Sequence, residues 1–247
     1  MAGHCSRRIA LARPLSCAPM LKRLASSRYA FPAAILAVAA IAGVVVLIAS
    51  SGGDDGGGSD KASCKEVPAP QPKNVEKGKR PTLELDKTKT YTATIDTNCG
   101  QFVIELDAKR APKTAASFVS LARDGFYDGL GFHRIAPGFV IQGGDPSGDG
   151  TGGPGYKTHE PPPDDVAYTE GVVAMAKGGS EPAGTAGSQF FVVTGADSNL
   201  PADYAVLGNV VKGMDAVKRI EGKASTQDGP PSEPVVMSTV KITEAPS

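Results

Sequence analysis

Residues 132–146 read Phe132-His-Arg-Ile-Ala-Pro-Gly-Phe-Val-Ile-Gln-Gly-Gly-Asp-Pro146. The part Gly138-Phe-Val-Ile-Gln142 is a short β-type run bounded by glycines, which is typical of a strand between turns. Taken alone, an arginine on such a run is ordinarily half of a surface ion pair, and a phenylalanine is ordinarily a core residue. Whether Arg134 and Phe139 are functional residues therefore depends on the sequence around them.

Further β-type runs lie on both sides of this segment, and helical patterns occur at two places. Pro112–Arg123 begins with proline and is followed by Gly125, and Met214–Ile220 carries apolar residues on one face. Many strands separated by Gly and Pro turns, with two inserted helices, predict one mainly β domain over 87–247, a barrel or a sandwich. The β-type runs are Tyr91–Thr97, Gln101–Leu106, Gly171–Ala176, Gln189–Thr194, Tyr204–Leu207 and Val235–Ile242.

The net charge of zero is the sum of three unlike regions. The chain has 26 Lys and Arg against 26 Asp and Glu, but residues 1–30 hold six basic residues and no acidic one. Residues 31–50 carry no charge, and the rest of the chain has a net charge of −6. A mildly acidic domain does not favour a polyanion, so we expect no nucleic-acid partner.

Residues 31–50 are uncharged and mostly apolar, and about 20 such residues span a bilayer as a helix. We expect a transmembrane signal-anchor helix, with residues 1–30 as a basic cytoplasmic tail and the C-terminal domain outside, because positive charges stay inside. The alternative is a cleaved signal peptide, with small residues Ala49 and Ser51 before the cut, although this apolar run exceeds the usual length. The start of translation, Met1 or Met20, stays open.

Residues 51–86 are rich in Gly and Pro and contain no aromatic residue, which predicts a flexible linker. In the expected topology Cys64 and Cys99 face the oxidising side, where a disulfide persists. Two interpretations stay open, a Cys64–Cys99 bridge from the linker to the first hairpin and two unrelated thiols. Neither cysteine has the spacing of a metal site, so no metal is expected.

Two glycine-rich segments match known ligand-binding motifs only in part. Gly148-x-Gly150-x-x-Gly153 fits a dinucleotide fingerprint, but the prolines that follow exclude the helix that would hold the pyrophosphate. Asp145 begins an imitation of a calcium loop that has Tyr156 where a bidentate Glu is required. We therefore expect no cofactor.

Residues 132–146 closely resemble the FHR-x-x-x-GF-x-x-QGGD signature of the cyclophilins, which are peptidyl-prolyl cis-trans isomerases. The likeness extends from about Thr92 to Ile242. It implies a closed eight-stranded antiparallel β-barrel capped by two α-helices, isomerisation of X–Pro bonds without a cofactor, and monomeric action on proline-containing polypeptides. The further matching blocks are Ala111–Thr114, Gly125–Gly129, Gly148–Tyr156, Gly171–Ala176, Gly187–Phe191 and Leu207–Gly208.

The resemblance also implies roles for individual residues. The catalytic residues would be Arg134, Gln142 and Phe139, with Arg134 facing the prolyl nitrogen and Gln142 orienting it. Lys177 stands where an Asn is usual, and it either biases the groove toward acidic partners or is a solvated loop lysine. The substrate-binding residues would be His133, Val140, Ala176, Lys177, Gln189, Phe191, Leu200 and Tyr204.

Two positions depart from the pattern of many eukaryotic cyclophilins and resemble bacterial members. Asn199 replaces a Trp, which puts cyclosporin binding in doubt, and Tyr204 replaces the pocket His. The sequence thus predicts a membrane-anchored, extracytoplasmic prolyl isomerase that assists the folding of exported proteins. The alternative is a non-catalytic module that binds Pro-containing segments as a chaperone or scaffold. The enzyme is favoured because binding alone does not require Arg134.

Overall fold

The structure is a computed structural model that describes residues 63–75 and 78–247, and the statements below concern these residues. The expected cytoplasmic tail (1–30), the expected transmembrane helix (31–50) and the start of the expected linker lie outside them. Within the described residues, none of the helices combines the length and the apolar character that crossing a membrane requires.

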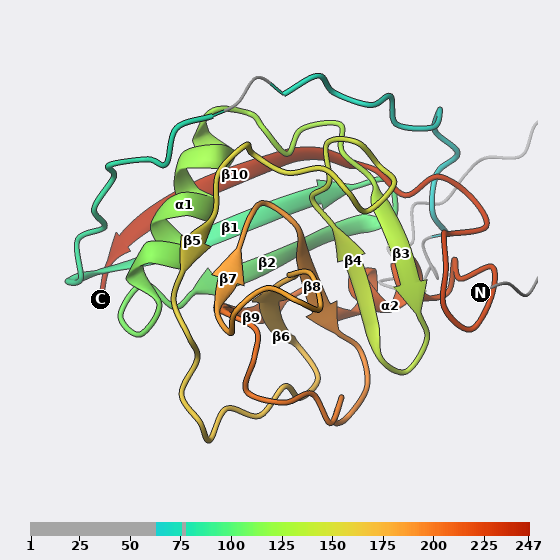
Figure 1. Cartoon of the computed structure of the whole chain (residues 1–247). Helices are drawn as coiled ribbons and strands as arrows, with labels where there is room; N and C mark the ends of the chain where they lie inside the picture. The colour runs from blue at the N-terminus through green and yellow to red at the C-terminus, as the bar shows by residue number, and fades with distance from the viewer. Residues whose placement is uncertain (1–62, 76–77) are drawn as a thin grey trace, which may run out of the picture. The chain divides into compact units, whose positions relative to one another are not determined.

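The domain is built on one antiparallel sheet of eight strands in the order β10-β1-β2-β9-β6-β8-β4-β3 (Figure 1). A small second sheet pairs β5 (Thr158–His159) with β7 (Thr185–Ala186). The mainly β prediction is confirmed. The strands of the large sheet are β1 (Lys89–Thr97), β2 (Gly100–Leu106), β3 (Phe132–Ala136), β4 (Val140–Gly143), β6 (Val172–Met175), β8 (Phe190–Val193), β9 (Val206–Lys212) and β10 (Met237–Pro246).

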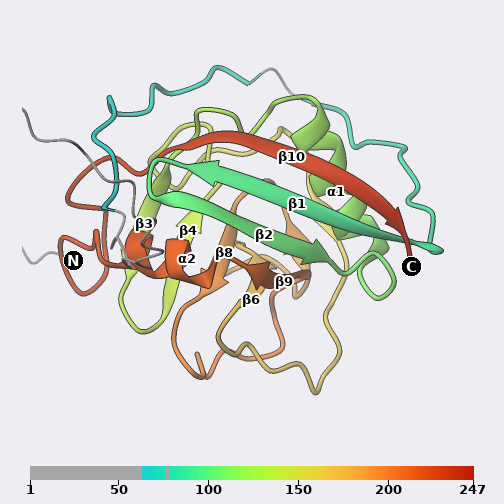
Figure 2. The ribbon, with the colours of Figure 1, turned by 180° about the vertical axis from the view of Figure 1, so that it is seen from behind.

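The large sheet curls around the core, as the view from its other side shows (Figure 2). In the described part of the chain its end strands, β3 and β10, share no ladder. An isolated bridge joins Gly131 to Val236 beside them, and the Phe132 N–H donates to the Val235 carbonyl at 2.9 Å. The coarse fold is therefore the expected one, and full closure of the barrel stays a prediction.

The two predicted helices are present. α1 (Pro112–Arg123) has the predicted bounds, and α2 (Met214–Glu221) is one residue longer than expected. Proline suits the first turn of α1 because its missing N–H has no partner there in any helix. The N–H groups of Lys113 and Thr114 instead donate to the Glu160 carboxylate at 3.2 and 2.8 Å, so an acidic group caps the positive end of α1.

Strand alternation on β8 separates the core from the opposite face of the sheet. Phe190 points into the main core, where its ring packs against Phe118 and Phe132 with centroid distances of 5.8 and 6.2 Å. Its neighbour Phe191 points the other way, into a smaller apolar cluster that includes Val140. The second cluster forms the floor of the site described below.

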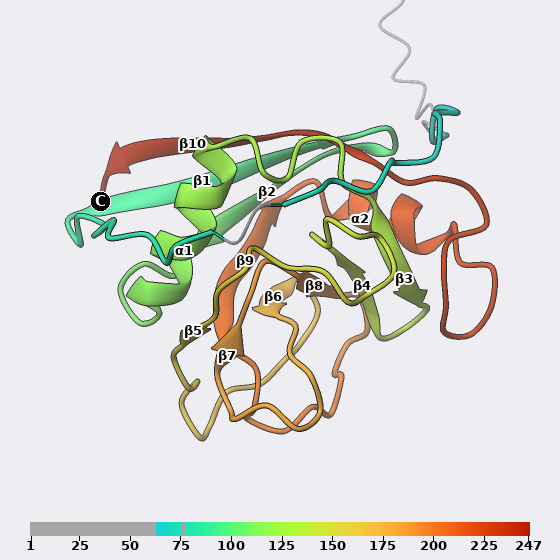
Figure 3. The ribbon, with the colours of Figure 1, turned by 45° about the horizontal axis from the view of Figure 1, so that its top comes forward.

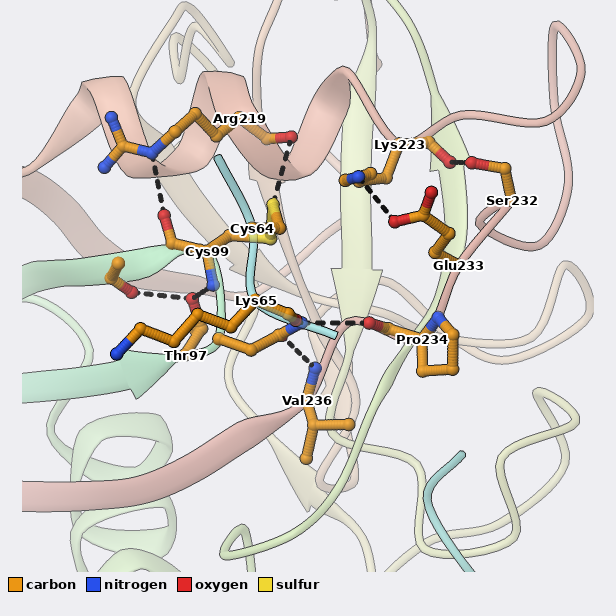
Figure 4. Close-up of a disulfide and its surroundings, with 12 residues drawn as sticks. Cys64, Lys65, Thr97, Cys99, Arg219, Lys223, Ser232, Glu233, Pro234 and Val236 are labelled. Atoms are coloured by element: carbon orange, nitrogen blue, oxygen red, sulfur yellow. Dashed lines mark hydrogen bonds and ion pairs between the residues drawn. A yellow bond between two sulfur atoms is a disulfide. The ribbon is translucent and has the colours of Figure 1, made fainter. Parts of the chain in front are cut away.

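Residues 63–75 and 78–86 form no helix or strand and run along the domain; we call them the belt (Figures 1 and 3). A disulfide joins Cys64 to Cys99 in the β1–β2 turn, with sulfurs 2.04 Å apart (Figure 4). Beside it, the Lys65 N–H donates to the Asn98 carbonyl at 2.8 Å, and the Asn98 amide donates to the Lys65 carbonyl at 2.7 Å. Of the two interpretations left open by the sequence, the structure contains the bridge.

The belt also contacts the Gly-rich loop, residues 144–157. The Lys73 N–H donates to the Pro146 carbonyl at 2.8 Å, and the Gly78 N–H donates to the Pro154 carbonyl at 3.1 Å. The Lys73 ammonium donates to the carbonyl of Phe126 at 3.2 Å, beyond the end of α1. The sequence predicts a flexible linker over 51–86, of which the belt is the described part; these contacts hold the belt against the domain.

Candidate active site

A cavity of about 170 Å³ lies on the face of the sheet opposite the main core. Most of the site residues implied by the sequence meet there, although they are spread over 71 positions. The residues that line the cavity are Arg134, Phe139, Val140, Gln142, Ala176, Lys177, Phe191, Leu200 and Tyr204.

Strand register brings the centre of this site together. Arg134 on β3 is the partner of Gln142 on β4, and Gln142 is in turn the partner of Phe191 on β8. Directly paired residues of antiparallel strands point to the same face of the sheet. A cation, an amide and an apolar ring therefore form one row, and Val140 two residues before Gln142 extends the apolar part.

The Arg134 guanidinium is held on three of its N–H groups. It donates to Gln142 Oε1 at 3.1 Å and to the two carboxylate oxygens of Asp228 at 2.7 Å each. Its carbon lies 5.9 Å from the centre of the Phe139 ring. The hydrogen bonds to Asp228 raise the pKa of Arg134 against the opposing effect of burial, so the group is a permanent cation. Sequence reasoning missed Asp228.

A relay of side-chain amides continues from Arg134 to the Gly-rich loop. Gln142 Nε2 donates to Gln189 Oε1 at 3.0 Å, and Gln189 Nε2 donates to the carbonyls of Gly150 and Gly152 at 2.9 Å each. Gln189 lines a neighbouring cavity of about 400 Å³, which shares Gln142, Ala176 and Lys177 with the first one. The relay fixes both glutamine amides, because each of them donates and accepts.

His133 lies near Gly150 and is not among the residues that line either cavity. Both of its ring nitrogens are buried, without a hydrogen-bond partner among the described residues. Burial lowers the pKa of His133, opposed by the nearby Asp145 carboxylate, so the ring is neutral near pH 7. In the described ranges, no group of three or more His, Cys, Asp or Glu side chains is arranged to hold a metal ion.

Lys177 is not the solvated loop lysine that was one of its two interpretations, and it lines both cavities. Its side chain is only 3% exposed, and its ammonium forms an ion pair with Asp203 at 2.6 Å. The same group donates to the Glu181 carbonyl at 3.0 Å and lies 5.5 Å from the centre of the Tyr204 ring. Because its partners lie within the protein, Lys177 is a structural part of the wall.

Tyr204 forms the side wall against Phe191. The two rings meet edge to face at 87°, with centroids 5.4 Å apart. Tyr168 packs edge-on behind Tyr204 at 6.1 Å, and its hydroxyl accepts from the Tyr204 N–H at 3.1 Å. Asn199, at the position of the Trp in many eukaryotic cyclophilins, does not line the cavity, whereas the adjacent Leu200 does.

The arrangement is an apolar recess with a fixed cation at its rim. Such a site holds a small apolar ring and places N–H donors beside it. It can change the electron distribution of a bound amide without forming a covalent bond, because a positioned charge stabilises the charge that develops during a reaction.

Comparison with known proteins gives one consistent result. The family model described as "Cyclophilin type peptidyl-prolyl cis-trans isomerase/CLD" matches residues 92–242. Peptidyl-prolyl cis-trans isomerase A of Mycobacterium tuberculosis is 37% identical over 171 residues, covering 62% of this chain and 92% of the relative. A peptidyl-prolyl cis-trans isomerase of Helicobacter pylori is 40% identical over 145 residues, covering 56% and 85%.

The solved structures that resemble this chain belong to the same family. The crystal structure of a cyclophilin-type peptidyl-prolyl cis-trans isomerase from Cryptosporidium parvum has a TM-score of 0.58 and 30% identity, covering 64% of this chain and 99% of the other. A second structure of that protein, in the presence of the dipeptide Ala-Pro, has a TM-score of 0.57 and 29% identity. It covers 62% of this chain and 98% of the other.

Proposed function

Because the chain belongs to the family of cyclophilin-type peptidyl-prolyl cis-trans isomerases, we propose that Arg134, Gln142 and Phe139 are its catalytic residues. The chain is an enzyme of this type, and the proposal concerns how it works. The observation that carries it is the single cavity in which the Arg134 cation and the apolar side chains of Phe139 and Phe191 meet.

The chemical problem is rotation about a bond with partial double-bond character, with a barrier of about 18–20 kcal/mol. Twisting the X–Pro bond breaks the conjugation and localises a lone pair on the prolyl nitrogen. An N–H group of Arg134 that reaches this nitrogen stabilises the twisted state more than either planar state, which is the requirement for catalysis. Gln142 holds the guanidinium in the required direction at 3.1 Å.

The apolar side of the cavity supplies binding. Phe139, Val140, Phe191 and Leu200 would surround the pyrrolidine ring, with Tyr204 as a side wall. A related isomerase was studied in the presence of the dipeptide Ala-Pro, which supports a proline-containing ligand. With the ring held, rotation moves the residue before proline, and the neighbouring cavity lined by Gln189, Ala176 and Lys177 leaves room for that chain.

We further propose that the enzyme acts on exported proteins as a membrane-anchored monomer with a closed barrel. The uncharged segment 31–50, with its basic residues on the N-terminal side, supports an anchor and this orientation. The Cys64–Cys99 disulfide supports the oxidising side of a membrane. Labelling the full chain in intact cells with a membrane-impermeant reagent for lysine tests the orientation, since only an outward domain reacts.

The catalytic proposal is tested with the full chain in detergent micelles and a short X–Pro peptide. We expect Arg134→Ala to lower kcat/KM by about 100-fold or more, the usual effect of removing one preorganised donor. The matched control is Arg110→Ala, which removes an exposed arginine paired with Asp107. Equal activity of Arg134→Ala and the wild type would show that the cation is not catalytic. A wild-type chain without activity would instead favour the non-catalytic binding module.

A further inference from the structure

We infer that Asp228 is a positioning residue for the isomerase reaction, which it serves by holding Arg134 in one orientation. The inference rests on the proposed role of Arg134 and goes beyond it. Asp228 lies in the loop between α2 and β10, residues 222–236, and is 94 positions from Arg134 in the sequence.

The contact between the two residues is bidentate. Arg134 Nε donates to Oδ1 of Asp228 and a terminal nitrogen donates to Oδ2, each at 2.7 Å. This geometry uses one edge of the planar guanidinium and defines its plane as well as its position. The other terminal nitrogen donates to Gln142. Of the five N–H groups, three have these partners and two are left to reach a substrate.

Asp228 does not share the cavity with the substrate. It is not among the residues that line the cavity, so its carboxylate approaches Arg134 from outside. The hydrogen bonds with Arg134 lower the pKa of Asp228, so the carboxylate is ionised near neutral pH. A carboxylate on the outer edge fixes the cation without occupying the place where a prolyl ring would bind.

The backbone places Asp228 at this edge. The next residue, Gly229, pairs with Ile135 on β3: the Ile135 N–H donates to the Gly229 carbonyl at 2.7 Å, and the Gly229 N–H donates back at 3.2 Å. The loop therefore runs beside β3, at the outer edge of this strand, and pairs with it through one isolated bridge (Figure 1). Because this bridge is antiparallel, Arg134 and Asp228 lie diagonally across it on the same face, a separation that the long arginine side chain can span.

The loop is stabilised by its own contacts. Lys223 and Glu233 form an ion pair at 2.6 Å, and Ser232 Oγ donates to the Lys223 carbonyl at 3.0 Å (Figure 4). Ser225 Oγ donates to the Pro230 carbonyl at 2.6 Å. Asp228 is thus presented from a loop closed at its base, which is what a residue that orients another one requires.

A different interpretation is that the pair is only a surface salt bridge. Arg134 and Asp228 are 34% and 54% exposed, and exposed pairs contribute little to stability. The two interpretations predict different measurements. Removal of a positioning residue lowers kcat because Arg134 loses its orientation, whereas removal of a mere surface pair leaves kcat unchanged.

The experiment compares Asp228→Ala, Asp228→Glu and the control Glu233→Ala in the full chain. The control removes an ion pair from the same loop without touching Arg134. We expect Asp228→Ala to lower kcat about fivefold with little change in KM, and Asp228→Glu to recover most of that loss. We also expect the ¹⁵N signal of the Arg134 Nε–H group, sharp in the wild type, to broaden in Asp228→Ala only.

Wild-type kcat in Asp228→Ala would overturn the inference, whether or not the Arg134 signal broadens, and so would an increase in kcat. An equal loss in Glu233→Ala would also overturn it, because the loop rather than the carboxylate would then be responsible. Arg134→Ala is measured in parallel. If it retains activity, the role of Arg134 is wrong; if it loses activity while Asp228→Ala does not, only the role of Asp228 is wrong.

Discussion

The ammonium group of Lys177 lies 5.5 Å from the centre of the Tyr204 ring, inside the wall of the cavity that also contains Arg134. The same group pairs at 2.6 Å with Asp203, the residue before Tyr204. One buried cation thus contacts Tyr204, which lines the cavity, and also the residue before it. The family usually has an Asn here, so this wall is built differently in this chain.

We expect Lys177→Ala to weaken substrate binding. Without the cation, the Tyr204 ring loses a contact worth about 1 kcal/mol, so KM rises about fivefold and kcat changes less. Asp203 is 34% exposed, so water can solvate its carboxylate after the change.

Steady-state kinetics with an X–Pro peptide measure both constants. Lys89→Ala, which removes the cation of the surface pair with Glu244, is the control. A fall in kcat with unchanged KM would show instead that Lys177 acts on the transition state.

Reduction of the Cys64–Cys99 disulfide is expected to destabilise the domain. The bridge closes a loop with a sequence separation of 35, and cross-links of this size contribute about 2–4 kcal/mol by restricting the unfolded chain. Urea unfolding of the full chain in micelles, with and without dithiothreitol, measures the change. The variant with Cys64→Ser and Cys99→Ser is expected to unfold at the lower midpoint under both conditions. An unchanged wild-type midpoint after both thiols are shown to be free would contradict the prediction.

The belt is expected to hold the Gly-rich loop in place. A Cβ atom at Gly78 would lie 2.6 Å from the Pro154 carbonyl oxygen, so Gly78→Ala pushes the belt away from the loop. We expect faster amide hydrogen exchange across residues 146–157 and a loss of kcat/KM of about twofold, because Gln189 is anchored on this loop. Gly153→Ala adds the same methyl group where nothing lies within 4 Å and is the control. Identical exchange in the two variants would mean that the belt does not support the loop.

His133 is expected to make stability depend on pH. Burial lowers its pKa, so in acid the unfolded state takes up a proton before the folded state does. Its contribution to stability is complete above the ordinary pKa of about 6.5 and is lost as pH falls from there through the lowered pKa of the folded state. Comparison of His133→Gln with the wild type at pH 7.5 and 5.5 should show a smaller acid loss in the variant. His159→Gln, on an exposed residue, should behave like the wild type.

Local patterns were sufficient to predict most elements of the domain. Pro112 and the helical spacing after it gave the bounds of α1, because both signals lie within the helix itself. The β-type runs indicated β1, β2, β4, β6, β8 and β10, but the run Tyr204–Leu207 reaches only the start of β9, and β3 was not predicted. The two-residue strands β5 and β7 are too short to show alternation. The cavity residues were found through the family pattern, since spacing alone cannot show which strands pair.

The contacts that the sequence did not reveal join residues far apart in the chain. Asp228 lies in a loop with no periodic pattern, and its role follows only from the bridge between Gly229 and Ile135. The burial of Lys177 depends on Asp203, which reaches it through the packing of a different loop. No local signal distinguishes such residues from the solvated charges that are common on loops.

The loop beside β3 also determines how an extended chain can approach the enzyme. A free sheet edge attracts extended segments, which add as an extra strand whatever their sequence. The backbone groups on the outer edge of β3 are already hydrogen-bonded to the loop, because the N–H groups of Phe132 and Ile135 donate to the carbonyls of Val235 and Gly229. A polypeptide therefore cannot extend the sheet at the strand that carries Arg134. If the recess binds the prolyl ring as proposed, a client is recognised by that ring and leaves without a ladder of backbone hydrogen bonds to break at this edge.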